Sequence, residues 1–231
     1  MKAFSHLFID LAPVKEIIES HGVPHTEVDL ILANGESVGF SYVVRDGDRI
    51  SVYPVFEALD ITPLLRLRPK PLREPRFVLD THLGRLAAYL RMLGFDTVYE
   101  KETSDAELAR ISHDEHRILL TRDRGLLKRG AVTHGYYVRE TQARKQLMEV
   151  VRRFDLATLL QPFTRCLRCN STLYSASKDN VRDLVPERSA GRYEQFWRCP
   201  GCERVYWQGS HYRRMRNLIE SVIEGQGSPS L

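Results

Sequence analysis

The sequence predicts an α/β fold with a parallel central sheet. Three short apolar runs, at residues 77–79, 97–99 and 117–121, alternate with segments whose apolar side chains recur at three- and four-residue steps. Strands that alternate with amphipathic helices over short connections are typical of a parallel sheet flanked by helices. A smaller amino-terminal segment with a hairpin pattern precedes this core, and a carboxyl-terminal segment holds all 4 cysteines of the chain.

The amino-terminal segment, residues 1–60, predicts a small domain with a helix and a hairpin. A helix is expected from Val14, and Gly22 ends it ahead of a proline. Asn34-Gly35 is a strong signal for a tight turn between two strands. The expected strands cover residues 28–32, 38–42 and 49–53. No catalytic pattern is visible in this segment.

Two stretches of biased composition are expected to connect or end the domains. Residues 61–75 are rich in proline, arginine and leucine, which predicts a semi-rigid linker. The tail at 225–231 is rich in glycine and serine, which predicts disorder. The domains expected from these boundaries are therefore 1–60, the central core at 76–160 and the cysteine-bearing segment at 161–224.

The central core begins with a strand at residues 77–79 and a helix that ends at Gly94. A second strand follows, and Ser104 and Asp105 then open another helix. The third strand ends just before Asp123, and a fourth strand is expected at 136–138, followed by a helix at 141–154. The first helix carries this apolar stripe: Leu83, Leu86, Ala87, Leu90 and Leu93.

Three aspartates fall where regular structure ends. Asp80 and Asp123 each follow a strand, and Asp105 begins a helix. The carboxyl ends of parallel strands meet along one edge of the sheet, where ligands bind. Three carboxylates that converge in water repel one another, but Mg²⁺ or Mn²⁺ can hold them together, as in phosphodiester hydrolysis. Each aspartate alone also fits a helix cap or a turn, so the prediction of a metal site rests on their coincidence.

Arginines near these aspartates are candidates for contact with phosphate. Arg122 and Arg124 flank Asp123, so either could clamp a phosphate or balance the acidic cluster. Arg85 lies one turn into the first helix and is equally well explained as a solvated surface arginine.

The cysteines form two Cys-x-x-Cys pairs, and 29 residues separate the pairs. Such spacing in a reducing compartment predicts a tetrahedral four-thiolate zinc site. Disulfides are the alternative, and a cytoplasmic location disfavours them. A closed four-cysteine shell leaves no position for water, so this Zn²⁺ is expected to be structural. The expected ligands are Cys166, Cys169, Cys199 and Cys202.

Aromatic and basic residues interleave after the second cysteine pair. Arg213 and Arg214, with the neighbouring aromatics, fit a surface that grips single-stranded RNA. Packing within the ribbon explains Tyr206 or Trp207 equally well. His211 is a candidate for RNA contact or for catalysis, and a structural role fits it as well.

Three stretches carry a family resemblance: Asp80-Thr-His-Leu-Gly-Arg-Leu-Ala-Ala-Tyr-Leu-Arg-Met-Leu-Gly-Phe-Asp96, Ser104-Asp105 and Leu119-Leu-Thr-Arg-Asp123. They resemble the Mut-seven C-terminal ribonuclease domain family, a branch of the PIN-like nucleases with a zinc ribbon appended. The resemblance covers residues 76–215 approximately. It implies a PIN-like parallel sheet with flanking helices and a metal-dependent ribonuclease that hydrolyses RNA phosphodiester bonds. It also implies that Asp80, Asp105 and Asp123 bind the catalytic Mg²⁺ or Mn²⁺, with the Thr121 hydroxyl nearby.

The amino-terminal segment is similar to the ubiquitin-like β-grasp domain that often precedes this family. Its Asp-Gly-Asp-Arg-Ile-Ser-Val-Tyr-Pro stretch at 46–54 is similar to sulfur-carrier proteins. The terminal Gly-Gly that a sulfur carrier needs is absent, which argues against a carrier role. The resemblance leaves two roles open: a module that docks a protein partner or orients RNA, and a passive structural domain.

The bulk composition is that of an ordinary soluble protein of 231 residues. No apolar run approaches the length of a membrane helix and no secretion signal is visible, so a cytoplasmic location is expected. Residues 1–71 carry 7 Lys/Arg against 10 Asp/Glu, whereas residues 72–231 carry 27 against 20. A basic, arginine-rich segment around an acidic site suits RNA as the partner.

Two other functions remain compatible with this sequence. One is a non-catalytic RNA-binding or adaptor protein that keeps the PIN-like fold, against which the three aspartates argue. The other is a toxin-like partner in a two-protein system, although the two appended domains make the chain larger than a minimal toxin requires.

Overall fold

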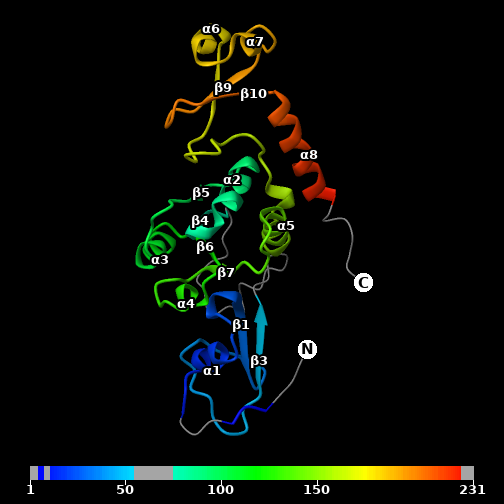
Figure 1. Cartoon of the computed structure of the whole chain (residues 1–231). Helices are drawn as coiled ribbons and strands as arrows, with labels where there is room; N and C mark the ends of the chain where they lie inside the picture. Colours follow the sequence, from blue (N-terminus) through cyan, green and yellow to red (C-terminus); the bar gives the residue numbers. More distant parts are fainter. Residues whose placement is uncertain (1–4, 8–10, 55–74, 225–231) are drawn as a thin grey trace.

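The structure is a computed structural model that describes residues 5–7, 11–54 and 75–224. Figure 1 shows an elongated molecule, with the amino-terminal domain at one end, the α/β core in the middle and the cysteine-bearing segment at the other end. The predicted linker, apart from Pro75, and the predicted tail at 225–231 lie outside the described residues. Among the described helices, none is both long enough and apolar enough to cross a membrane.

The amino-terminal domain packs one helix against an antiparallel sheet. Helix α1 (Val14–Ser20) and the 3₁₀ helix η1 (His25–Glu27) precede strand β1 (Val28–Ala33). In the described part of the domain, β1 lies between β2 (Glu36–Ser37) and β3 (Ile50–Pro54). Val14 and Ile18 are buried on α1 because they pack against the apolar face of β1.

The strand expected at 38–42 does not form, and this prediction is wrong. The turn at Asn34-Gly35 forms with positive φ at both residues, but β2 ends at Ser37. Beyond it, the carbonyls of Phe40 and Tyr42 accept hydrogen bonds from the first amides of α1, at 3.3 and 2.7 Å. Because α1 has no side-chain cap, these carbonyls satisfy amides that would otherwise lack a partner. The chain therefore leaves the sheet to cap the helix.

The core contains a parallel sheet of four strands in the described residues, in the order β5-β4-β6-β7. The sequence predicted these strands, and their bounds agree to within about two residues. The register aligns Leu79 of β4 with Leu120 of β6, and Thr121 of β6 with Tyr137 of β7. All four carboxyl ends therefore lie at the same edge. The strands are β4 (Phe77–Leu79), β5 (Thr97–Val98), β6 (Ile118–Thr121) and β7 (Gly135–Tyr137).

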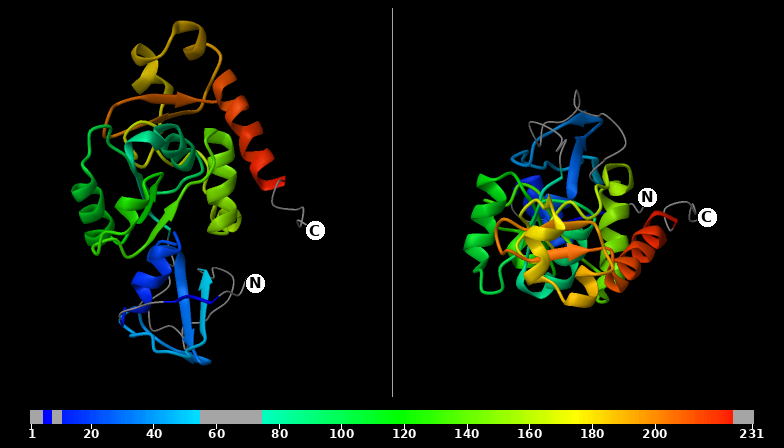
Figure 2. Two further views of the ribbon diagram at one scale, coloured as in Figure 1. Left: turned by 60° about the horizontal axis from the view of Figure 1, so that its bottom comes forward. Right: turned by 90° about the horizontal axis from the view of Figure 1, so that it is seen from above.

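Helices cover both faces of this sheet (Figures 1 and 2). Helices α2 (Gly84–Met92) and α5 (Ala143–Arg153) pack on the face that receives Phe77 and Leu79. Helices α3 (Asp105–Asp114) and α4 (Arg124–Leu127) cover the opposite face, which receives Val78. Strands that are buried on both faces need apolar residues at every position, which explains the continuous apolar runs.

The cysteine-bearing segment folds as an antiparallel ribbon with the strand order β10-β9-β8. Two short helices, α6 (Lys178–Val181) and α7 (Glu187–Ala190), lie between β8 and β9. Helix α8 (Ser210–Glu224) then runs back from the ribbon along α5, and its Ile219 and Val222 are buried in the core. Figure 2 shows this return from a second direction. The strands are β8 (Tyr174–Ala176), β9 (Phe196–Arg198) and β10 (Val205–Trp207).

The amino-terminal domain contacts the free edge of β7 through Glu27. One carboxylate oxygen of Glu27 accepts a hydrogen bond from the backbone N–H of Tyr137 at 3.0 Å, and the other accepts from the Arg139 guanidinium at 2.9 Å. His25, which is buried beside it, lies 3.1 Å through Nε2 from the Val132 carbonyl. A sheet edge exposes unpaired amides, so Glu27 covers the edge of the core sheet and fixes the domain to it.

Replacement of Glu27 by alanine should loosen this contact. The Tyr137 amide and the Arg139 guanidinium would lose their acceptor, at a cost of about 1–3 kcal/mol. We expect faster hydrogen exchange at the Tyr137 amide. Glu36→Ala removes the same charge from an exposed position of the same domain and should leave that amide protected. Equal protection in both variants would contradict the docking role of Glu27.

Candidate active site

Asp80 and Asp123 lie on either side of the Thr121 hydroxyl at the carboxyl edge of the core sheet. Thr121, at the end of β6, donates through Oγ1 to Oδ2 of Asp80 at 2.7 Å. The same Oγ1 accepts a hydrogen bond from the backbone N–H of Asp123 at 2.9 Å. Two aspartates that are far apart in the sequence are thus held by one buried threonine.

Asp80 is a buried carboxylate without a cationic partner. It is 7% exposed, and no ion pair reaches it from the described residues. Its Oδ1 accepts from the backbone N–H of Thr81 at 2.5 Å and from the Thr81 hydroxyl at 3.1 Å. A buried charge is costly unless it is paired or bound to a metal. Among the described residues, only neutral donors form hydrogen bonds with the Asp80 carboxylate, so this site is suited to a cation.

Asp105 and Asp123 both retain free carboxylate oxygens. Asp123 caps α4 because its Oδ1 accepts from the Gly125 N–H at 2.7 Å, and its Oδ2 has no hydrogen-bond partner among the described residues. Asp105 is exposed as the first residue of α3, and the cap of that helix is the Ser104 hydroxyl, which accepts from the Glu107 N–H. Neither aspartate forms an ion pair with a described residue.

The three aspartates do not form a tight cluster. Among the described residues, a group of three or more potential ligand atoms that all lie within 4.8 Å of one another occurs at the four cysteines and not at the aspartates. The donor set, three carboxylates with a hydroxyl, still has the oxygen chemistry that Mg²⁺ and Mn²⁺ prefer.

The arginines next to Asp123 have structural partners. Arg122 donates through Nη1 to the carbonyls of Arg139, at 3.1 Å, and Glu140, and so holds the loop that follows β7. The Arg124 guanidinium lies over the ring of Tyr137, 5.0 Å from its centroid. Arg85 is exposed and lines a groove between the amino ends of α2 and α5.

The four cysteines converge as the sequence predicted. The Sγ atoms of Cys166 and Cys202 lie 3.5 Å apart, and those of Cys169 and Cys199 lie 3.2 Å apart. Four thiolates around Zn²⁺ at Zn–S ~2.3 Å lie ~3.8 Å from one another, so these positions fit a tetrahedral zinc ion. Burial would raise the pKa of the Cys169 thiol, but hydrogen bonds with the side chain and backbone of Ser171 outweigh it, and the pKa falls to about 6.

A buried arginine that sequence reasoning missed joins the cysteine site to the core. Arg91 of α2 is 4% exposed and donates to the carbonyls of Leu167 and Arg168, at 3.2 and 2.7 Å, in the first cysteine turn. It also donates to the Thr97 carbonyl at 2.9 Å. The available signal was its spacing, because Ala87 and Phe95, each four residues from Arg91, are apolar and buried.

Asp96 forms a second link between the core and the cysteine site. It accepts hydrogen bonds from Arg117 and Asn170, each at 2.7 Å. Burial would raise the pKa of the Asp96 carboxyl, but these two hydrogen bonds outweigh it and the pKa is lowered. Asp96 precedes β5 and Arg117 precedes β6, so the cysteine site is attached at the amino edge of the sheet, opposite the three aspartates.

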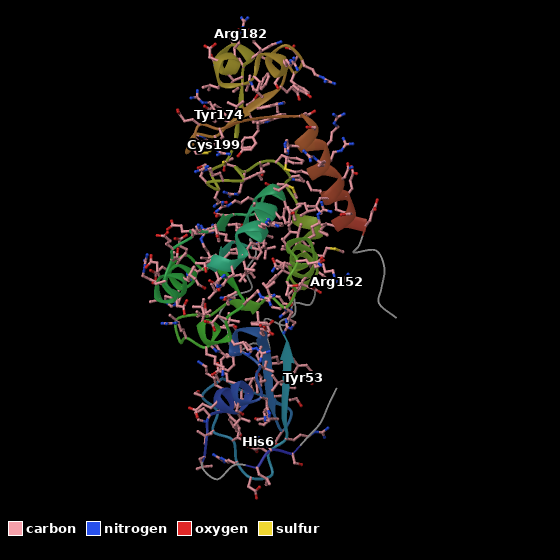
Figure 3. The ribbon with its side chains drawn as sticks, viewed as in Figure 1. His6, Tyr53, Arg152, Tyr174, Arg182 and Cys199 are labelled. Atoms are coloured by element: carbon pink, nitrogen blue, oxygen red, sulfur yellow. The ribbon has the colours of Figure 1, made fainter. Side chains whose placement is uncertain are left out.

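The aromatic residues of this segment pack within the ribbon or against the core. The Tyr206 hydroxyl is 3.1 Å from the Cys166 Sγ, so this ring belongs to the ribbon's own packing. The Tyr212 ring packs 4.4 Å from that of Phe163. His211, Arg213 and Arg214 begin α8, which Figure 1 places next to β10, and the structure does not bring them to the aspartates. Figure 3 labels Cys199 at this end of the core and Tyr53 at the other.

Comparison with protein families identifies both parts of the chain. The model of the Mut7-C RNAse domain matches residues 75–219, and that of the Mut7-C ubiquitin domain matches residues 1–60. A search of curated proteins and a search of solved structures each found no match. The first model covers more than half of the chain and includes the aspartates and the four cysteines. The chain therefore belongs to the Mut7-C RNAse domain family, with a Mut7-C ubiquitin domain ahead of the nuclease-family domain.

Proposed function

We propose that this protein is a metal-dependent ribonuclease that hydrolyses RNA phosphodiester bonds at the carboxyl edge of its parallel sheet. The observation that carries the proposal is Asp80, a buried carboxylate whose neighbours are neutral hydrogen-bond donors. A bound cation would supply the missing positive charge. The ligands would be Asp80, Asp105 and Asp123, and the metal Mg²⁺ or Mn²⁺. When bound, this metal supplies a water-derived nucleophile and stabilises charge on the phosphate.

The chain's own residues orient these ligands. The Thr121 hydroxyl donates a hydrogen bond to Oδ2 of Asp80 and accepts one from the backbone N–H of Asp123. It therefore holds the two aspartates in a fixed position relative to each other. Asp123 keeps Oδ2 free, and Asp105 is free and exposed. The free oxygens of Asp105 and Asp123 leave both side chains able to bind a cation.

Zn²⁺ at the four cysteines would be structural in this proposal. All four ligand positions are thiolates, which leaves none for water or substrate. The site is also attached at the amino edge of the sheet, away from the aspartates. Four reduced cysteines suit the cytoplasm, where we place the protein. His211, Arg213 and Arg214 would add a contact surface for RNA.

Cleavage of single-stranded RNA in the presence of Mn²⁺ tests the proposal. We expect wild-type protein to cleave and Asp80→Asn to lose at least about 100-fold in rate, because a neutral amide is a poor ligand for a hard cation. Asp114→Asn removes an exposed aspartate that pairs with Arg110, and it should cleave like wild type. Folding is checked by circular dichroism.

Two outcomes would contradict parts of the proposal. Cleavage by Asp80→Asn at the wild-type rate would show that Asp80 is not needed for catalysis. Tight RNA binding by a wild-type protein that cleaves no RNA would favour the adaptor alternative.

A further inference from the structure

A groove lies between the amino ends of α2 and α5, and one of its walls begins at His82, two residues after Asp80. It has a volume of about 680 Å³, within the range of small-molecule sites. One wall comes from the segment that directly follows Asp80 and carries His82 and Arg85. The other wall comes from the start of α5 and carries Arg144. None of the residues that line it is acidic.

The groove concentrates positive charge that nothing else in the described protein neutralises. His82, Arg85 and Arg144 are exposed, and none of them has an ion pair or a hydrogen bond with another described residue. Other arginines of the core do have acidic partners: Arg110 pairs with Glu107, and Arg117 pairs with Asp96. The two uncompensated guanidinium groups of Arg85 and Arg144 in a concave site attract an anion.

The backbone adds to this charge. Neither α2 nor α5 has a side-chain hydrogen bond at its amino-terminal cap. The first amides of α5 therefore lack a side-chain partner, and the partial positive charge of its helix dipole adds to that of the arginines. Helix α2 instead continues from the 3₁₀ helix Thr81–Leu83, which Asp80 caps. These features together favour a phosphate over a neutral ligand.

An aromatic ring lies one helical turn along the same wall. Tyr89 follows Arg85 by four residues on α2 and also lines the groove, so the two side chains share one face of the helix at a spacing of ~6 Å. A cation and an aromatic ring at this spacing match the two halves of a nucleotide. Aromatic rings stack on RNA bases and arginines bind the backbone phosphates.

We infer that this groove binds one nucleotide of single-stranded RNA next to the scissile bond. Arg85, Arg144 and His82 hold the phosphate, and the base stacks on Tyr89. The inference rests on the proposed function in so far as Asp80, two residues before His82, is where cleavage takes place. It places the path of the RNA strand in the groove between α2 and α5, two helices that lie next to each other in the folded protein.

Binding of a fluorescein-labelled oligouridine to full-length protein, in an Asp80→Asn background, tests the groove without cleavage. Loss of both arginines in Arg85→Ala/Arg144→Ala should weaken binding at least about 10-fold at low salt. The slope of log affinity against log salt should become shallower by at least about 0.7, the value for one phosphate contact on a single strand. Tyr89→Leu should weaken binding about 10-fold with the slope unchanged, and Tyr89→Phe should restore it.

The matched control removes two arginines elsewhere. Arg182 and Arg188 are exposed and unpaired among the described residues, and Figure 3 shows Arg182 at the far end of the molecule. Arg182→Ala/Arg188→Ala should bind RNA with wild-type affinity and slope. Arg85→Lys/Arg144→Lys, which keeps the charges, should recover most of the salt dependence.

The outcomes separate this inference from the proposed function. If the groove variants bind oligouridine as tightly as the parent, while Arg213→Ala/Arg214→Ala does not, the ribbon binds the RNA and the inference is wrong. If wild-type protein cleaves no RNA but the groove variants still lose binding with a shallower slope, the ribonuclease fails and the groove stands. Loss of binding without any change in slope in the arginine variant would contradict phosphate recognition.

Discussion

Replacement of Cys199 by serine should abolish zinc binding and unfold the ribbon. Cys199 is fully buried, and its Sγ lies 3.2 Å from that of Cys169. The ribbon's own apolar cluster has a buried core of only Val181, Val185, Ala190 and Phe196 among the described residues. The free energy of zinc binding in small metal-dependent folds is about 10–16 kcal/mol, which a cluster of this size cannot replace.

The measurements are zinc content by mass spectrometry and hydrogen exchange across the ribbon. We expect no bound zinc in Cys199→Ser and loss of protection from Cys166 to Trp207. The matched variant is Tyr206→Phe, which removes the hydroxyl 3.1 Å from Cys166 and keeps the ring. It should retain zinc, with affinity lowered by about 10-fold because an outer hydrogen bond to a ligand is lost.

Damage should also reach the core in Cys199→Ser. The first cysteine turn accepts two hydrogen bonds from the buried Arg91, and Asn170 donates to Asp96. Without an ordered ribbon, Arg91 loses two of its three acceptors and Asp96 loses the hydrogen bond from Asn170, so the core should unfold at a lower temperature. A ribbon that remains protected without metal would contradict the structural role of zinc.

Substitution of Gly94 by alanine should strongly destabilise the junction between the core and the ribbon. Gly94 ends α2 at φ +98°, and a Cβ there would lie 2.2 Å from the Gln161 carbonyl oxygen. This oxygen belongs to the backbone, which is held by the hydrogen bond from the Gln161 N–H to the Leu93 carbonyl at 2.9 Å. Left-handed strain of about 1–2 kcal/mol and overpacking of about 1–3 kcal/mol add to roughly 2–5 kcal/mol.

The control for Gly94→Ala separates strain from collision. Gly35 has a similar φ of +91°, but an added Cβ would meet no atom within 4 Å. Gly35→Ala should therefore cost only the strain, about 1–2 kcal/mol. Urea unfolding, monitored separately in the two domains, gives the loss in free energy of unfolding for each variant. An equal loss of stability in both variants would show that the contact with Gln161 has no effect.

The sequence predicted most of the core because its elements depend on local patterns. Each β-strand of the core is buried on both faces, so a short apolar run was sufficient to find it. The register of β4 and β6 comes from the structure, which aligns Leu79 with Leu120 and so places Asp80 level with Thr121. The strand at 38–42 was predicted wrongly because an apolar alternating run packs equally well as a loop that caps α1.

The candidate site could be predicted only in part. The aspartates were found because they follow strands, and the resemblance also pointed to Thr121. The distances between the aspartates in the folded protein could not be predicted, because they depend on how far the start of α3 lies from β4 and β6. Arg91 was missed because its partners are carbonyls of the cysteine turn, 76 and 77 residues away along the chain.

Sequence alone determined which groups of this protein are chemically able to act: carboxylates at the ends of strands, and thiols paired at the spacing of a zinc knuckle. Those features are local, so neighbouring residues are enough to define them. Tertiary structure decided which of them meet. It placed Thr121 between two aspartates, attached the ribbon to the opposite edge of the sheet, docked Glu27 on β7 and opened a basic groove between α2 and α5. Each of these contacts joins segments far apart in sequence, and only the packing of helices on the sheet brings such segments together.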